Sequence, residues 1–229
     1  MRGKAPVKKT AIAAFSLVEV AIALVILGLI MGAVLKGKDL LDSARINALL
    51  TEIAHHRLAI EAFQEAYGFW PGDFPYARQT WGRGRDGDGD GRVGGSGLDP
   101  ATDAGNVWAH LIYAQLMVSG DRPTDDGPGP ICNAPMPRIG GRITLEENPT
   151  GVKGGLWFII GQIRDKKNDG GLLTPKQALV LLGKVGQRSP TQGRVIIADG
   201  VDKPGKCLCG KTLCLEEERP NCIVLMAVE

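Results

Sequence analysis

Residues 15–35 read FSLVEVAIALVILGLIMGAVL, and the rest of the chain is organised around this stretch. Its only charged residue is Glu19. Because a helix rises about 1.5 Å per residue, the stretch is long enough to cross the roughly 30 Å hydrocarbon core of a bilayer. It therefore predicts a membrane-spanning helix. A carboxylate inside a membrane is costly unless it is paired, so Glu19 is a candidate functional residue.

The segment before this stretch, MRGKAPVKKTAIAA, is basic. Its charged residues are Arg2, Lys4, Lys8 and Lys9. Basic flanks of membrane helices stay in the cytoplasm, so we expect a single pass through the membrane with the C-terminal part of the chain on the outer side. A cleaved secretory signal is disfavoured, because the apolar run is too long and no A-x-A site follows it.

Residues 13–19, AAFSLVE, resemble the processing site of the type IV pilin and pseudopilin family. The family pattern is a short basic leader, a small residue and then Phe-[ST]-Leu-[IV]-Glu. The resemblance implies that a prepilin peptidase removes residues 1–14 by cutting between Ala14 and Phe15, and methylates the new amine of Phe15. The family usually has Gly before the cut, where this chain has Ala14.

The resemblance also implies a function. Glu19 of one subunit is expected to pair with the Phe15 amine of its neighbour, which fixes the register between subunits during assembly. The protein is then a structural, non-enzymatic subunit of a type IV pilus or of a type II secretion pseudopilus. Its expected partners are the peptidase, other pilin or pseudopilin subunits and an inner-membrane assembly platform. The large outer domain, and the likeness of residues 67–73 (YGFWPGD) to a turn of larger bacterial pilin-like proteins, favour a minor subunit.

One other interpretation competes with the filament subunit. The apolar stretch is also compatible with an ordinary signal anchor that contains a stray Glu19. In that case the chain keeps residues 1–14 and is a single-pass membrane-anchored protein whose outer domain binds calcium and a ligand.

The chain contains no recognisable catalytic motif, so we expect no enzymatic activity. A net charge of +2 gives no electrostatic case for binding nucleic acid.

The helical pattern continues beyond residue 35. Apolar side chains recur at intervals of three, four or seven residues at Ile46, Leu49, Ile53, Ile60, Phe63 and Tyr67. This spacing predicts one helix over residues 15–67, with a membrane-embedded first part (15–35) and an amphipathic second part. Gly68 and Pro71 form the expected stop signal, so residues 68–229 are predicted to form the globular domain.

The remaining pattern predicts an α+β fold, in which an antiparallel sheet packs on the long helix. We expect a second helix over residues 102–118 and a short helix over 174–183, for which Thr174 is a good N-cap and Pro175 fits the first helical position. Four short runs rich in Val, Ile, Leu or aromatic residues predict strands. They are residues 142–145, 156–163, 194–198 and 223–228.

A candidate calcium loop lies between residues 86 and 97. Its expected ligands are the carboxylates of Asp86, Asp88 and Asp90 and the backbone carbonyl of Arg92, with Gly91 at the turn. The twelfth position is Gly97, so the usual bidentate Glu is missing. We expect Asp73, Asp99 or Asp103 to replace it if calcium binds. The alternative is a flexible, solvated acidic loop.

The chain has five cysteines, Cys132, Cys207, Cys209, Cys214 and Cys222, all of which follow the membrane span. An exported domain favours disulfides over a zinc site, and the spacing lacks the paired C-x2-C pattern of zinc modules. The odd number leaves one cysteine free or intermolecular, and the sequence does not tell which one.

Histidines and tryptophans are given structural interpretations. His55 and His56 diverge by about 100° on a helix and form no chelating pair, so we expect these two and His110 to be polar surface residues. The tryptophans are expected to be anchors of the core. They are Trp70, Trp81, Trp108 and Trp157.

Overall fold

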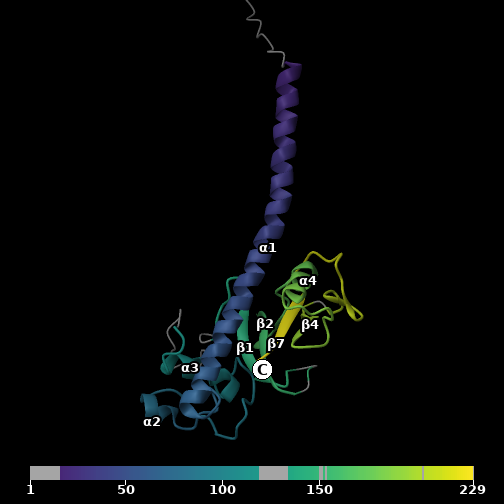
Figure 1. Ribbon diagram of the computed structural model, residues 1–229. Helices are drawn as coiled ribbons and strands as arrows, with labels where there is room; N and C mark the ends of the chain where they lie inside the picture. The colour runs from purple at the N-terminus through teal and green to yellow at the C-terminus, as the bar shows by residue number, and fades with distance from the viewer. Residues whose placement is uncertain (1–15, 119–133, 150–151, 153, 203, 229) are drawn as a thin grey trace, which may run out of the picture. The chain divides into compact units, whose positions relative to one another are not determined.

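The computed structural model describes residues 16–118, 134–149, 152, 154–202 and 204–228. The chain divides into two compact units, Met1–Asp42 and Ser43–Glu229, each of which is described by itself. The first helix, α1 Leu17–Tyr67, contributes residues to both units (Figure 1). A long N-terminal helix together with an antiparallel sheet gives the α+β fold that the sequence predicts.

In the first unit, the large apolar side chains of α1 are exposed wherever the structure describes them. The exposed fraction runs from 45% at Val20 to 89% at Leu17. This part of the helix is strongly apolar, and none of its most apolar stretch is buried. By length and composition, α1 is therefore able to cross a membrane.

The second unit begins with the remainder of α1, which ends at Tyr67. Gly68 follows with a φ of 74°, and its N–H donates to the Gln64 carbonyl at 2.8 Å. This left-handed residue closes the helix, as the sequence predicts. A short helix that the sequence analysis did not anticipate, α2 Ala77–Trp81, lies just beyond the turn.

Helix α3 Asp103–Tyr113 begins where expected, with the Thr102 side chain accepting a hydrogen bond from the Gly105 N–H. The expected end at residue 118 is wrong. Gln115 adopts a φ of 58°, its N–H donates to the Ile112 carbonyl, and the Leu116 N–H donates to the Leu111 carbonyl. This pair of bonds is a Schellman motif, which ends the helix at Tyr113 although no glycine is present.

The main sheet has five antiparallel strands, in the order β1-β2-β7-β4 with β3 paired to β2 (Figure 1). The strands are β1 Arg142–Glu147, β2 Leu156–Arg164, β3 Lys167–Gly170, β4 Val195–Asp199 and β7 Cys222–Ala227. Four of them match the predicted strands, whereas β3 was not predicted. A separate small hairpin, β5 Leu208–Cys209 with β6 Thr212–Leu213, lies in the cysteine-rich tail.

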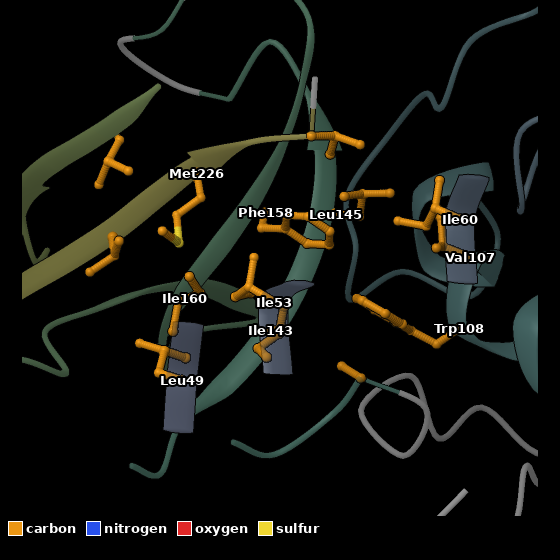
Figure 2. Close-up of a cluster of buried hydrophobic side chains, with 14 of the residues drawn as sticks. Leu49, Ile53, Ile60, Val107, Trp108, Ile143, Leu145, Phe158, Ile160 and Met226 are labelled. Atoms are coloured by element: carbon orange, nitrogen blue, oxygen red, sulfur yellow. The ribbon is translucent and has the colours of Figure 1, made fainter. Parts of the chain in front are cut away.

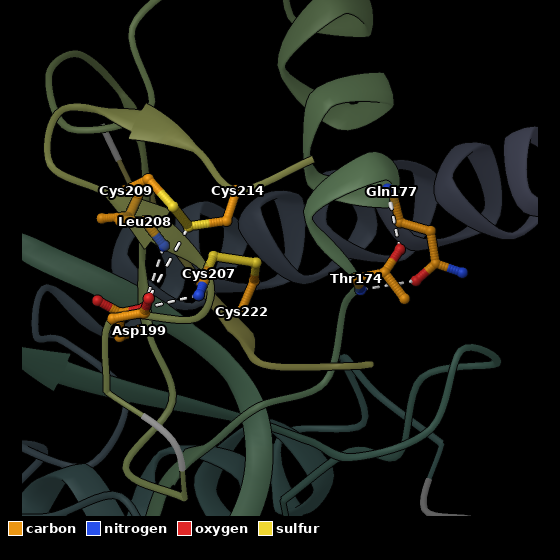
Figure 3. The surroundings of a disulfide bond; sticks show 9 residues. Thr174, Gln177, Asp199, Cys207, Leu208, Cys209, Cys214 and Cys222 are labelled. Atoms are coloured by element: carbon orange, nitrogen blue, oxygen red, sulfur yellow. Dashed lines mark hydrogen bonds between the residues drawn. A yellow bond between two sulfur atoms is a disulfide. The ribbon is translucent and has the colours of Figure 1, made fainter. Parts of the chain in front are cut away.

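Helix α4 Pro175–Lys184 agrees with the short helix expected over 174–183. The Thr174 side chain accepts a hydrogen bond from the Gln177 N–H at 3.2 Å, and the Gln177 side chain accepts one from the Thr174 N–H at 3.0 Å. Figure 3 shows this reciprocal capping box. It satisfies two N–H groups that the first turn of a helix otherwise leaves free.

One face of the sheet forms the core together with α1 and α3. Phe158 and Ile160 of β2 and Met226 of β7 are at most 5% exposed and face this side. Figure 2 shows them with residues from the two helices. The buried α1 residues of this core are Ile46, Leu49, Ile53, Ala59, Ile60 and Phe63, and all except Ala59 lie on the predicted stripe.

The opposite face of the sheet is apolar as well. Because side chains alternate along a strand, Trp157 and Ile159 of β2 point away from the core that contains Phe158. They form a second, smaller hydrophobic cluster with Ile223 and Leu225 of β7. Antiparallel sheets commonly have one solvated, polar face, so this second apolar face is a departure from the usual pattern.

Candidate functional site

Three carboxylates from two separate segments converge near the end of α1. Asp73 belongs to the turn after α1, whereas Asp88 and Asp90 belong to the Asp-rich loop. Each offers an oxygen, and these oxygens all lie within 4.8 Å of one another. Asp73 is fully buried, and the other two are exposed. We call these three residues the acidic cluster.

Backbone hydrogen bonds hold the Asp-rich loop against the turn. Asp73 Oδ2 accepts from the Gly91 N–H at 3.0 Å, and the Asp73 carbonyl accepts from the Gly89 N–H at 3.1 Å. The Gly87 N–H donates to the Phe74 carbonyl at 2.9 Å. At Gly87 a Cβ atom would collide with the backbone of Asp73, so only glycine fits there. The loop is thus built to bring its carboxylates to Asp73.

Arg92 attracts Asp90, whereas no basic side chain pairs with Asp73 among the described residues. Asp73 Oδ1 is buried and has no hydrogen-bond partner there. Burial raises the pKa of Asp73, and the charges of Asp90 and Asp88 raise it further. Burial, followed by the charges of Asp88, Asp73 and Asp90, raises the pKa of Asp103 to about 6. A cation among these oxygens would remove both the repulsion and the unsatisfied acceptor.

The structure assembles these ligands differently from the linear loop that the sequence suggested. Asp86 is not in the acidic cluster, because its Oδ1 accepts a hydrogen bond from the Arg78 N–H at 2.8 Å. The Arg92 side chain binds Glu147, with Nη2 to Oε1 at 2.8 Å, and the role of the Arg92 backbone carbonyl as a ligand stays a prediction. Asp99 accepts from the Ala101 N–H at 2.9 Å. Of the three replacement ligands considered, Asp73 joins the cluster, and Asp103 interacts with it electrostatically.

His110 holds the turn that carries Asp73. Its side chain is fully buried, so the expectation that it is a surface residue is wrong. Nδ1 accepts from the Gly72 N–H at 2.9 Å, and Nε2 lies 2.8 Å from the Arg85 carbonyl. A neutral ring with its proton on Nε2 makes both bonds, and burial lowers the pKa of His110 in keeping with this state. His110 therefore ties α3 to both segments that form the acidic cluster.

The other histidines and the tryptophans have simpler roles. His55 is exposed as expected, whereas His56 packs edge-on against Trp108, with ring centroids 5.1 Å apart. Burial, followed by the charge of His55, lowers the pKa of His56 to about 4. All four tryptophans contribute to hydrophobic clusters, as expected.

Of the processing residues, Ala14 and Phe15 lie outside the described residues. Glu19 lies in the first turn of α1 and is exposed among apolar side chains. The basic residues that follow it on α1, Lys36 and Lys38, lie roughly four to five helical turns farther along. Within the described part of α1, no cation is therefore close to Glu19.

The cysteine-rich tail forms two disulfides, Cys207–Cys222 and Cys209–Cys214. These bonds decide the pairing that the sequence left open, and they leave the four cysteines unavailable to zinc. Asp199 Oδ1 accepts hydrogen bonds from the N–H groups of Cys207 and Leu208 at 2.8 and 3.1 Å, which attaches the tail to the end of β4 (Figure 3). Cys132 lies outside the described residues.

Comparison with solved structures finds the major type IV pilin PilA1 from Clostridium difficile. The two chains share 15% sequence identity, the match covers 82% of this chain and 96% of that one, and the TM-score is 0.37. No protein-family model matches the chain. None of the curated proteins matches it either.

Proposed function

We propose that the chain is a membrane-anchored structural subunit of a type IV pilus or of a type II secretion pseudopilus. The observation that carries this proposal is the contrast between two parts of α1. From Leu17 to Met31 its large apolar side chains are exposed, whereas from Ile46 to Phe63 the helix contributes to a core. An exposed apolar surface of this extent needs a cover, which is lipid before assembly and neighbouring helices after it.

The sequence around the start of α1 supports processing by a prepilin peptidase. We infer that this enzyme removes residues 1–14 and methylates the amine of Phe15. Glu19 would then carry a negative charge near the start of an exposed apolar helix that offers it no nearby cation. The Phe15 amine of a neighbouring subunit supplies that cation on assembly. The subunit waits in the inner membrane with residues 68–229 in the periplasm and is extracted by an assembly platform.

We further infer that the acidic cluster holds a calcium ion. Calcium accepts irregular sets of carboxylate and carbonyl oxygens, which is what Asp73, Asp88 and Asp90 offer. The buried, unsatisfied Asp73 Oδ1 supports an ion at this position. Because the ligands come from the turn after α1 and from the Asp-rich loop, the ion would fasten these two segments together. Its role would be structural, in a protein without enzymatic activity.

Processing is the decisive test of the filament subunit. The full chain is coexpressed with an active prepilin peptidase, and in parallel with a catalytically inactive one as the matched control. Mass spectrometry of the purified chain should find a mature protein that begins with N-methylated Phe15 only when the peptidase is active. An unchanged N-terminus in both cultures would refute the proposal.

The acidic cluster also favours a second candidate, a membrane-anchored extracytoplasmic protein that binds calcium and a ligand. This candidate does not require processing or assembly. It predicts a chain that keeps residues 1–14 and stays monomeric in detergent. The same mass spectrum therefore separates the two candidates, because only the filament subunit loses its leader.

A further inference from the structure

The apolar face of the sheet that points away from α1 contains a groove of about 460 Å³. Its floor is formed by Ile159 of β2, Ala198 of β4, and Ile223 and Leu225 of β7. Ile159, Ile223 and Leu225 also belong to the second hydrophobic cluster. Pockets of this volume commonly bind ligands of about drug size, and the floor of the groove provides apolar contact.

Among the residues that the structure describes, the wall of the groove is mainly acidic. Three carboxylates, those of Glu146, Asp169 and Asp199, line it together with one ammonium group, that of Lys167. Side chains from three strands, β1, β3 and β4, thus place an excess of negative charge beside an apolar floor. Such a combination selects a ligand that has an apolar part and a cationic part.

Two of the three carboxylates already have hydrogen-bond donors. Asp199 Oδ1 binds the N–H groups of the cysteine-rich tail, and Glu146 Oε1 accepts from the Gly97 N–H at 2.9 Å. The Asp169 side chain makes no hydrogen bond or ion pair with any described residue, and its Oδ1 is buried. Burial raises the pKa of Glu146, and so does the charge of Asp169, which shows that these two acids act on each other. Of the three carboxylates, Asp169 is therefore the one that no described donor or cation satisfies.

We propose that the groove binds an arginine-containing segment of a partner protein, with the guanidinium group at Asp169 and apolar neighbours on Ile159, Ile223 and Leu225. Arginine suits the site better than lysine, because its planar group donates several hydrogen bonds in fixed directions and is more weakly hydrated. The groove is formed within residues 43–229, so the proposal does not depend on the filament assignment.

The test uses the full chain in an uncharged detergent and two synthetic tripeptides, acetyl-Leu-Arg-Leu-amide and acetyl-Leu-citrulline-Leu-amide. Citrulline has nearly the shape of arginine and no charge, so the pair isolates the cation. Isothermal titration calorimetry should show the arginine peptide binding at least about tenfold more tightly, as expected for a charge-assisted hydrogen bond.

Three variants assign the binding to the groove. Asp169→Asn should weaken binding of the arginine peptide about tenfold and leave the citrulline peptide unaffected. Asp165→Asn is the matched control, because this exposed acid lies in the turn before β3 and outside the groove. Lys167→Ala should strengthen binding of the arginine peptide severalfold, since Lys167 is the one cation among the described residues of the wall. A misfolded chain cannot produce such a gain.

Several results would overturn the proposal. They are the absence of binding, equal affinity for the two peptides, or equal losses in Asp169→Asn and Asp165→Asn. Analytical ultracentrifugation of the same samples tests whether the chain self-associates through the groove. If the chain self-associates in detergent and Asp169→Asn abolishes this, the groove belongs to a second copy of the chain and not to another protein.

Discussion

Asp73 Oδ2 accepts a hydrogen bond from the Gly91 N–H over 3.0 Å, and this contact joins the turn after α1 to the Asp-rich loop. It uses one oxygen of the carboxylate and leaves Oδ1 buried without a partner among the described residues. Backbone hydrogen bonds thus hold the acidic cluster together, although the carboxylates of Asp73, Asp88 and Asp90 repel one another. The predictions about metal binding and pH follow from this arrangement.

Calcium should stabilise the folded chain through the acidic cluster. At a hundredfold excess over its dissociation constant, an ion that binds only the folded state adds about 2.7 kcal/mol to the free energy of unfolding. For a domain of this size, that raises Tm by roughly 5–10 °C. Asp73→Asn and Asp88→Asn should abolish most of the shift, measured on the full chain in detergent by the fluorescence of its tryptophans.

Asp86→Asn provides the matched control for this measurement. Asp86 lies in the same loop but binds the Arg78 N–H outside the acidic cluster. The variant should keep the calcium-dependent rise in Tm. If it loses as much as Asp88→Asn, the response comes from the net charge of the loop and not from a site that contains Asp73.

Asp103 should make the metal-free protein less stable as the pH rises. Its pKa is about 6 in the folded chain and has an ordinary value of 3.8, so the folded state holds more protons than the unfolded state between these values. The free energy of unfolding therefore falls as the pH rises from about 4 to about 6. Asp103→Asn removes this contribution, so its Tm should increase relative to that of the wild type over the same range.

The comparison between Asp103→Asn and the wild type cancels the effects of other groups. His56 has the opposite effect, because its pKa is lowered to about 4 and its contribution to stability grows as the pH rises toward 6.5. Both chains contain His56. A difference in Tm that does not change between about pH 4 and pH 7 would show that neither burial nor the acidic cluster raises the pKa of Asp103.

The two disulfides should contribute unequally to stability. Cys207–Cys222 spans 15 residues and joins the tail to β7, whereas Cys209–Cys214 spans 5 residues within the tail. Loop entropy predicts that removing the first by paired substitution with Ala costs about 3 kcal/mol, and removing the second about 2 kcal/mol. Urea unfolding followed by tryptophan fluorescence measures both losses. Thiol counting in denaturant should find one free cysteine, Cys132.

Ile60 and Leu58 should respond differently to substitution although both lie on α1. Ile60 is fully buried in the core, whereas Leu58 is 62% exposed. Ile60→Ala should lower the free energy of unfolding by about 2–5 kcal/mol, and Leu58→Ala should change it by less than about 0.5 kcal/mol. Urea unfolding of the full chain, in which residues 43–229 form the globular unit, measures both changes in the free energy of unfolding. Equal losses would mean that this part of α1 does not pack on the sheet as described.

Glu19→Ala should separate membrane insertion from assembly. The substitution removes a charge from an apolar helix, so insertion and leader cleavage should be intact. Incorporation into filaments alongside wild-type subunits should fall, because the Phe15 amine of the neighbour loses its partner. Quantitative immunoblotting of sheared filaments measures the incorporation. Wild-type levels of the variant in filaments would show that the pairing is not needed, as expected for a subunit at the tip.

The local pattern of the chain was sufficient for most of the secondary structure. The stop at Gly68, the capping box at Thr174 and four of the strands were read correctly, because each depends on residues within a few positions of one another. The end of α3 differs from the prediction, because Gln115 takes a left-handed conformation that glutamine does not favour. Strand β3 was missed because KNDG has neither alternation nor β-branched residues and owes its conformation to pairing with β2.

The sequence by itself determined which parts of the chain are apolar and which acids and cysteines are available, because composition and periodicity are local properties. Only the tertiary structure decided that Asp73 replaces Asp86 in the acidic cluster and that His110 is buried beneath both segments. It also decided the pairing of the cysteines. These relationships join residues that are distant in the sequence, and they depend on hydrogen bonds and steric limits, such as those at Gly87, that exist only once the chain has folded.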